Sequence, residues 1–119
     1  MNKDSKFVIG LDYGTDSVRS VIVGAEDGRE IASYVVEYPR WLMGKYSNPS
    51  NNQFRHHPAD YLEGLEESIK ESLNLAEKKI PGISNKIVAI SVDTTGSTPC
   101  FVDSNGTALS LLPEHQDDP

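Results

Sequence analysis

The sequence predicts an α/β fold in which a mixed sheet packs against one long helix. Three observations lead to this prediction. Short runs of apolar and β-branched residues come first, a long segment of helical periodicity follows, and another apolar run comes after it. Strands joined by short turns pair antiparallel, whereas a strand that returns after a helix commonly pairs parallel with an earlier one. We therefore expect a three-stranded antiparallel meander, one long helix, a crossover to a parallel strand and a C-terminal hairpin.

The meander is predicted from the N-terminal third of the chain. Residues 7–11 form a continuous apolar run, which is typical of a strand covered on both faces. Residues 17–23 form a second, β-branched run, and the connection 13–16 is short enough to make the two strands antiparallel neighbours. An Asp-Gly turn signal at 27–28 leads into a third strand at residues 30–38.

The helix is predicted at residues 58–80. Pro58 suits a first helical position, acidic residues lie early, lysines lie late, and Pro81-Gly82 ends the pattern. The expected buried face comprises Leu62, Leu65, Ile69, Leu73, Ala76 and Ile80. The preceding segment, 39–57, has no periodicity, and an ordered loop of that length is uncommon unless it serves a ligand or an interface.

The last third of the chain predicts one more strand and a hairpin. Residues 87–92 form another apolar run of the buried type, which delivers Asp93 at its carboxyl end. A loop rich in hydroxyl groups follows at 94–98. Segments 99–102 and 107–111 flank an Asn-Gly turn signal and are expected to pair as a hairpin.

Composition excludes several classes of protein. The 119 residues suffice for one domain with a modest core, and 11 basic against 18 acidic residues give a net charge of -7, which disfavours nucleic acid and anionic membranes as partners. Cys100 is the single cysteine, so no internal disulfide forms; we expect it to be a small core residue in a reducing, cytoplasmic protein. No apolar run is long enough for a signal peptide or a membrane span. The polar stretch 113–119 suggests a boundary inside a longer protein.

Residues 12–19 carry the chemistry of a phosphate-binding hairpin. Asp12 is suited to hold Mg²⁺ through water, because this ion keeps much of its hydration shell. Gly14 allows backbone to approach an anion and to take the unusual angles of a tight turn. Thr15 and Ser17 offer hydroxyl donors, and Arg19 offers a permanent positive charge with a fork geometry suited to phosphate.

An ordinary hairpin turn is the alternative interpretation, since Asp, Gly and Thr are common turn residues. Two features count against it. Asp12 follows a buried strand, and Arg19 lies inside a predicted strand, where a structural role is less natural. Neither of the two usual glycine-rich nucleotide fingerprints occurs in the sequence.

The hairpin and the order of the elements resemble the N-terminal subdomain of the actin, hexokinase and heat-shock ATPase superfamily, with its ribonuclease-H-like core. Within that superfamily the chain is similar to the FGGY carbohydrate kinases, and three further segments are similar to the ribulokinase branch of that family. These segments are Tyr38-Pro39-Arg40-Trp41, residues 51–61 and residues 92–99. The resemblance extends over residues 6–114.

The resemblance implies an ATP-dependent kinase that uses Mg²⁺ to convert L-ribulose to L-ribulose 5-phosphate in L-arabinose catabolism. It implies that residues 1–119 are the N-terminal part of kinase domain I. The hairpin residues implied to face the ATP phosphates are Asp12, Gly14, Thr15, Ser17 and Arg19, with Asp12 toward the metal. The aspartate that acts as the base of the family reaction is implied to lie beyond Pro119, so we expect no catalytic residue in this chain and no turnover by the chain alone.

Two departures from the FGGY pattern concern the sugar. Relatives such as glycerol kinase hold substrate hydroxyls with an Arg-Glu pair, where this chain has Gly96 and Ser97. The small residue leaves room for a longer sugar, and Gly96, Ser97 and Thr98 are the expected sugar-binding positions. Many members carry Gln-Asp-Pro where this chain has His56-His57-Pro58, which favours the ribulokinase branch over xylulose and glycerol kinases.

Several alternatives remain open from sequence. His56 and His57 are expected to cap a helix and bond loop groups rather than bind metal. Two roles remain open for Asp93. It could help to order the active cleft or bind metal-bound water, or it could have a structural role in which it bonds backbone amides of the loop. Trp41 and Phe54 are expected to pack over the sheet edge rather than wall a sugar pocket.

The functional alternatives are a kinase for D-ribulose, D-xylulose or ribitol, and a non-catalytic sugar or nucleotide sensor of the same superfamily. Self-association into a homo-oligomer is a further option, because a truncated domain leaves apolar surface uncovered.

Overall fold

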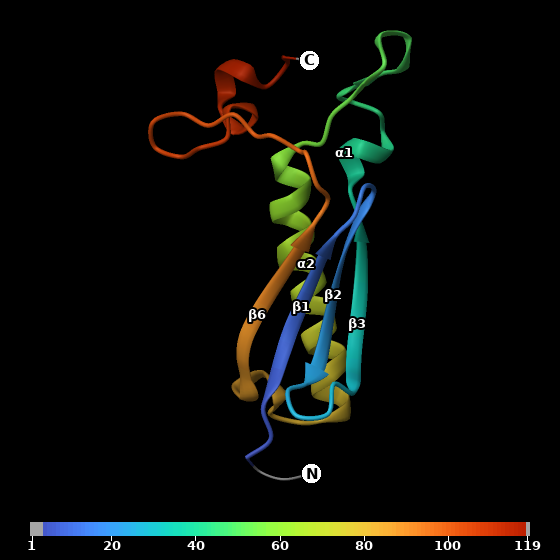
Figure 1. Cartoon of the computed structure of the whole chain (residues 1–119), viewed down its shortest axis with the longest axis vertical. Coiled ribbons are helices and arrows are strands. Elements are labelled where there is room, and N and C mark those ends of the chain that lie inside the picture. Colours follow the sequence, from blue (N-terminus) through green and yellow to red (C-terminus); the bar gives the residue numbers. More distant parts are fainter. Residues whose placement is uncertain (1–3, 119) are drawn as a thin grey trace.

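The computed structural model describes residues 4–118 and contains a four-stranded mixed sheet with the order β3-β2-β1-β6. Strands β1 (Phe7–Tyr13), β2 (Ser17–Gly24) and β3 (Glu30–Glu37) form an antiparallel meander. Strand β6 (Ile87–Thr94) follows the long helix and pairs parallel with β1. These pairings confirm the predicted meander and crossover. Figure 1 shows that β1 and β6 point toward the same end of the molecule.

Helix α2 (Pro58–Lys79) lies along one face of the sheet and packs mainly on β2 and β3 (Figure 1). The 3₁₀ helix η2 (Ile83–Lys86) connects it to β6. Within residues 4–118, no helix combines the length and the apolar character that a membrane crossing requires. The bounds of α2 confirm the helix predicted at residues 58–80 to within one residue.

The buried face of α2 differs from the prediction. Leu62 is 56% exposed, and the fully buried row is Asp60, Gly64, Ser68, Ser72 and Ala76. Small residues occupy this row because the helix lies close to the sheet: a Cβ atom on Gly64 would be 2.6 Å from Val18 Cγ1. The larger apolar residues of the predicted face, such as Leu65 and Ile69, flank the row and are only partly buried.

The core lies between α2 and one face of the sheet. Its buried residues are Phe7, Ile9, Leu11, Tyr13, Val18, Ile22, Ile31, Ala32, Tyr38, Ala76 and Ile83. The prediction that β1 and β6 are covered on both faces was wrong. β1 alternates buried and more exposed positions, and Val88, Ile90 and Val92 of β6 are each more than half exposed. The helix does not extend over β6, so the apolar composition of that strand is left uncovered.

The molecule is longer than a compact domain of the same size. The Cα radius of gyration is 17.1 Å and the extents are 55 × 31 × 22 Å. A compact domain of this length has a radius of gyration of about 13–14 Å. The chain is therefore elongated along the direction of its strands.

The segment 39–57 contains short elements that periodicity did not reveal, because each is four residues or fewer. They are α1 (Pro39–Leu42), β4 (Ser47–Asn48), the 3₁₀ helix η1 (Pro49–Asn51) and β5 (Gln53–Phe54), with β4 and β5 paired antiparallel. Trp41 packs against the core as predicted, whereas Phe54 is 55% exposed.

The C-terminal hairpin is reduced to a turn. The Asp103 amide donates to the Thr107 carbonyl and the Gly106 amide donates back to the Asp103 carbonyl, but only the bridge between Val102 and Ala108 forms beyond them. The 3₁₀ helix η3 (Leu109–Leu111) replaces most of the second strand expected at residues 107–111, and a further 3₁₀ helix, η4 (Pro113–His115), follows it. Cys100 is exposed, so its prediction as a core residue was wrong.

Candidate phosphate-binding site

Three charged side chains lie side by side where β1, β2 and β6 meet. Asp12 pairs with Arg19 across the antiparallel β1–β2 ladder and with Asp93 across the parallel β1–β6 ladder. Leu11 and Tyr13 on either side of Asp12 are buried toward α2, so strand alternation puts the three charged residues on the opposite face. All three are exposed, and none of the three side chains forms a hydrogen bond or an ion pair within the range 4–118.

This row of charges fits a phosphate bound with a divalent cation. Neighbouring strands are about 4.8 Å apart, and like charges directly opposite each other are destabilising. A cation between Asp12 and Asp93 relieves that repulsion, and Mg²⁺ is usually held by one or two carboxylates together with substrate phosphates. No group of three or more potential ligand side chains was found among the described residues, so a complete protein cage for a metal is absent from this range. Arg19 flanks the carboxylates with a charge suited to phosphate oxygens.

The backbone carbonyl groups of the hairpin that follows Asp12 accept hydrogen bonds from Tyr38 and contact His56. The Tyr38 hydroxyl donates to the Gly14 carbonyl at 3.1 Å, the Tyr38 amide donates to the Asp16 carbonyl at 2.9 Å, and His56 Nε2 lies 2.6 Å from the Thr15 carbonyl. In a trans peptide the C=O and the following N–H point in opposite directions. The amides of Thr15 and Asp16 are therefore aimed away from Tyr38 and His56, and no hydrogen bond from either amide is found within the described part of the chain.

One of the two reasons predicted for Gly14, the unusual backbone angles of a tight turn, was wrong. Its φ angle lies outside the left-handed region, so the turn does not require unusual backbone angles there. Its amide instead donates to the Ser17 carbonyl at 2.8 Å, and a Cβ atom would lie only 3.2 Å from that carbonyl oxygen. Glycine thus permits a narrow hairpin. Thr15 is exposed and Ser17 half-buried, with the Ser17 hydroxyl 3.3 Å from Asp16 Oδ1.

An aromatic cluster supports the hairpin from the helix side. The Tyr61 ring lies 5.1 Å from that of Tyr13 and 5.4 Å from that of Tyr38, and Trp41 meets His56 edge-on at 4.6 Å. Burial, together with the neighbouring tyrosines, raises the pKa of Tyr38 far above its usual value. Its hydroxyl therefore stays protonated and donates at neutral pH. Sequence reasoning missed these supporting residues, although the segments 38–41 and 51–61 that contain most of them stood out in the resemblance.

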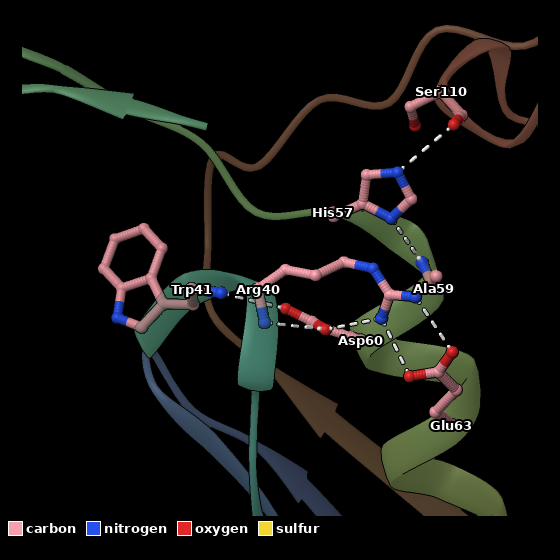
Figure 2. A network of polar contacts seen from close by, with 7 residues as sticks. All are labelled: Arg40, Trp41, His57, Ala59, Asp60, Glu63 and Ser110. Carbon is pink, nitrogen blue, oxygen red and sulfur yellow. Dashed lines mark hydrogen bonds and ion pairs between the residues drawn. The ribbon is translucent and has the colours of Figure 1, made fainter. Parts of the chain in front are cut away.

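Figure 2 shows the polar network beside the cluster. Asp60 is 1% exposed, and its carboxylate accepts from the Arg40 guanidinium at 2.9 Å and from the Trp41 amide at 3.1 Å, which fixes α1 to the first turn of α2. Glu63 receives two further hydrogen bonds from Arg40, and these hold the pKa of Glu63 below its usual range.

His57 caps helix α2, as predicted. Its Nδ1 accepts from the Ala59 amide at 3.0 Å, so its Nε2 carries the proton and donates to the Ser110 carbonyl at 3.2 Å (Figure 2). Burial lowers the pKa of His57, against the opposing effect of the Ser110 carbonyl.

The predicted sugar loop begins at the same end of the sheet. The Thr95 amide donates to the Tyr13 carbonyl at 3.1 Å, which places the loop next to the hairpin. Gly96, Ser97 and Thr98 are exposed; a Cβ atom on Gly96 would meet nothing within 4 Å, and Ser97 has a left-handed φ of 58°. A residue other than glycine in this conformation is uncommon and costs roughly 1–2 kcal/mol.

Comparison with known proteins first identifies the class. No family model matches the chain. The fold is similar to that of gluconate kinase from Lactobacillus acidophilus, with a TM-score of 0.67 and 25% identity over 88% of this chain and 18% of that one. The chain therefore has the fold of a segment of a carbohydrate kinase, which confirms the predicted fold class.

The sequence relatives narrow the class to ribulokinases. A ribulokinase of Vibrio parahaemolyticus is 49% identical over the whole chain, and those of Halalkalibacterium halodurans and Geobacillus thermodenitrificans are 34% and 35% identical over 97% and 96% of it. The chain spans about a fifth of the length of these relatives. It is homologous to the N-terminal part of ribulokinases, as the motifs had predicted.

Proposed function

We propose that this chain supplies the phosphate-binding part of an ATP-dependent kinase that phosphorylates L-ribulose to L-ribulose 5-phosphate. The observation that carries the proposal is the exposed row Asp12, Arg19 and Asp93 beside the unbonded amides of Thr15 and Asp16. Phosphoryl transfer depends on positioning and on neutralising phosphate charge rather than on covalent chemistry by the protein. The guanidinium and the two amides can donate to phosphate oxygens, and the carboxylates can hold a metal ion that neutralises phosphate charge.

Each residue has a role in this proposal. Arg19, the two free amides and the hydroxyl groups of Thr15 and Ser17 donate to phosphate oxygens of ATP. Asp12 holds Mg²⁺ through water, and Asp93 lies next to it for the same purpose. Gly14 keeps the hairpin narrow, because a Cβ atom there would crowd the Ser17 carbonyl.

The sugar is proposed to bind at Gly96, Ser97 and Thr98. The open space at Gly96 and the left-handed Ser97 support this, because strained backbone in a loop is often retained for ligand contact. The names of the relatives, which are ribulokinases, support ribulose as the sugar. No residue of this chain is proposed as the base, and the chain is proposed to be the N-terminal part of kinase domain I, inactive without the rest.

The proposal is tested by titrating the chain with MgATP in a calorimeter. Loss of one charge-assisted hydrogen bond costs about 1.5–3 kcal/mol, so Arg19→Gln is expected to weaken binding by about 10- to 100-fold. Asp12→Asn is expected to weaken the binding of MgATP more than it weakens the binding of ATP measured with the metal chelated. Arg29→Gln, in the connection between β2 and β3, and Asp117→Asn are the matched controls. MgATP affinity that is equal in the wild type, Arg19→Gln and Asp12→Asn proteins contradicts the assignment.

Activity separates the sugar kinases from one another and from a sensor. In a coupled ADP-release assay the full-length protein is expected to prefer L-ribulose over D-ribulose, D-xylulose and ribitol. Binding of ATP and sugar without turnover favours a sensor instead. Sugar-dependent ADP release by the 119-residue chain contradicts the expectation that it is inactive alone.

A further inference from the structure

His56 connects the phosphate-binding hairpin to helix α2 through both of its ring nitrogens. Nε2 lies 2.6 Å from the Thr15 carbonyl and Nδ1 lies 2.6 Å from the Tyr61 hydroxyl. A carbonyl oxygen only accepts hydrogen bonds, so Nε2 must carry the proton. In the neutral ring Nδ1 is then the acceptor, and Tyr61 donates to it. The two contacts together allow one tautomer of the neutral imidazole.

The contact with Thr15 determines where the next amide points. Because the peptide group is planar and trans, fixing the Thr15 carbonyl toward His56 fixes the Asp16 N–H in the opposite direction. Tyr38 does the same for the preceding peptide through the Gly14 carbonyl. The hairpin has no other side-chain hydrogen bond to its carbonyls among the described residues, so these two side chains set the orientation of both free amides.

Tyr61 continues the connection to the sugar loop. Its backbone carbonyl accepts from the Tyr13 hydroxyl at 3.2 Å, and the Tyr13 carbonyl accepts from the Thr95 amide at 3.1 Å. Burial raises the pKa of the Tyr61 hydroxyl, and the nearby Thr95 side chain partly opposes that rise. The Thr95 hydroxyl in turn lies 3.2 Å from that of Thr98. A continuous set of hydrogen bonds thus runs from the hairpin to the loop.

We propose that His56 is a positioning residue that aims the Asp16 amide at phosphate and, through Tyr61, couples the hairpin to the loop at residues 95–98. The functional part rests on the proposed function, since it assumes that phosphate binds at the hairpin and sugar at the loop. The structural part is that a change at His56 or Tyr61 alters both the hairpin and the loop at residues 95–98, and this part does not depend on any ligand. The segment 51–61, which marks the ribulokinase branch, then contributes to the site without touching substrate.

The wild-type chain tests the first step without any substitution. Long-range ¹H–¹⁵N correlation of the histidine rings is expected to show His56 as the Nε2-protonated tautomer, with the Nδ1 resonance shifted by an accepted hydrogen bond. The Nδ1-protonated tautomer overturns the proposal.

Variants then separate the two contacts in ligand-free spectra of the backbone amides. Tyr61→Phe is expected to shift the amides of Asp16 and of residues 95–98 together. His56→Gln keeps an N–H donor that can reach the Thr15 carbonyl, but it places no acceptor at the position of the ring Nδ1 that Tyr61 contacts. The loop amides are therefore expected to shift while Asp16 stays near its wild-type position. His56→Ala shifts both. Tyr34→Phe and His115→Ala are the matched controls, because Tyr34 lies on β3 opposite Ser20 and the His115 ring contacts Asp118. Loop amides that are unmoved by Tyr61→Phe overturn the coupling.

Titration with MgATP adds the functional readout. A neutral hydrogen bond is worth about fivefold in affinity, so His56→Ala is expected to weaken binding by at least that factor, and His56→Gln to restore most of it. Wild-type affinity in His56→Ala, with the ligand-free shifts as predicted, overturns the positioning role. If the wild-type chain itself fails to bind MgATP while the tautomer and the shifts are as predicted, the proposed function fails and the structural coupling stands.

Discussion

Replacing Gly64 with alanine tests how closely α2 approaches the sheet. In an exposed helix interior this change stabilises a protein by about 0.8–1 kcal/mol, because glycine has the lower helix propensity. Here the added Cβ would lie 2.6 Å from Val18 Cγ1, inside the distance at which carbon atoms repel each other strongly. Val18 is fully buried, and a β-branched side chain in a strand has few rotamers to escape to.

The sign of the effect follows from comparing the two terms. Forcing an extra methyl group into a packed core costs typically 1–3 kcal/mol. With the gain of about 1 kcal/mol in propensity, Gly64→Ala is expected to destabilise the chain by about 1 kcal/mol. In a Val18→Ala background the colliding atom is gone, and the nearest remaining atom outside Val18 is Tyr38 Cε1 at 4.0 Å, an ordinary contact. There the same change is expected to stabilise by about 1 kcal/mol.

Urea denaturation of the four proteins measures both effects as a double-mutant cycle. The expected coupling energy is about 2 kcal/mol, well above the few tenths found for independent sites. The reasoning is refuted if Gly64→Ala stabilises the wild-type chain by as much as it stabilises the Val18→Ala variant. That result would mean that the helix moves away from the sheet at little cost.

Three further predictions concern the core, the helix cap and the open strand. Ser72 and Ser20 are fully buried with their hydroxyl oxygens 2.5 Å apart, so Ser72→Ala is expected to cost about 1–3 kcal/mol by urea denaturation. The double variant with Ser20→Ala should lose less free energy of unfolding than Ser72→Ala alone, and an equal or greater loss contradicts the reasoning. Burial lowers the pKa of His57 below the unfolded value of about 6.5, so the unfolded chain binds more protons and stability is lost as pH falls below about 6.5. His57→Asn, which caps without titrating, should remove that part of the pH dependence; identical curves for the two proteins would refute it. Val92 is 58% exposed on a strand with a free edge, so the chain should self-associate with rising concentration and Val92→Lys should reduce this in sedimentation velocity; a wild-type monomer at every concentration counts against it.

The sheet was predictable because turns and periodicity are local signals. The Asp-Gly signal, the short connection 13–16 and the long helical pattern each specify a pairing or a crossover, and all of them are found. Burial was less predictable, since it depends on what covers an element. The composition of β6 suits a strand between two layers, but α2 packs mainly on β2 and β3, at the other side of the sheet from β6. Leu62 fits a helical stripe, yet the close approach at Gly64 selects a row of small residues instead.

The same division applies to the candidate site. The row Asp12, Arg19 and Asp93 follows from strand ends and turn chemistry, which the sequence displays. The support by Tyr38, His56 and Tyr61 does not, because those contacts join residues that are 24 to 48 positions apart and their geometry depends on how α2 lies on the sheet. Adjacent histidines gave the one local hint, and the structure divides their roles between the hairpin and the helix cap.

Asp93 carries the last prediction, because its two proposed roles have opposite effects on stability. It lies directly opposite Asp12, and no hydrogen bond from a loop amide to its carboxylate is found among the described residues. A like-charge pair across a ladder is destabilising by about 0.2–1 kcal/mol. Asp93→Asn should therefore stabilise the metal-free chain by that amount, with a gain that diminishes as salt screens the charges, while weakening binding of MgATP. A charge pair retained at a cost in stability is expected where function requires it. If Asp93→Asn instead destabilises the chain at every salt concentration, the carboxylate orders the loop at residues 94–98, and the site holds its metal through Asp12 alone.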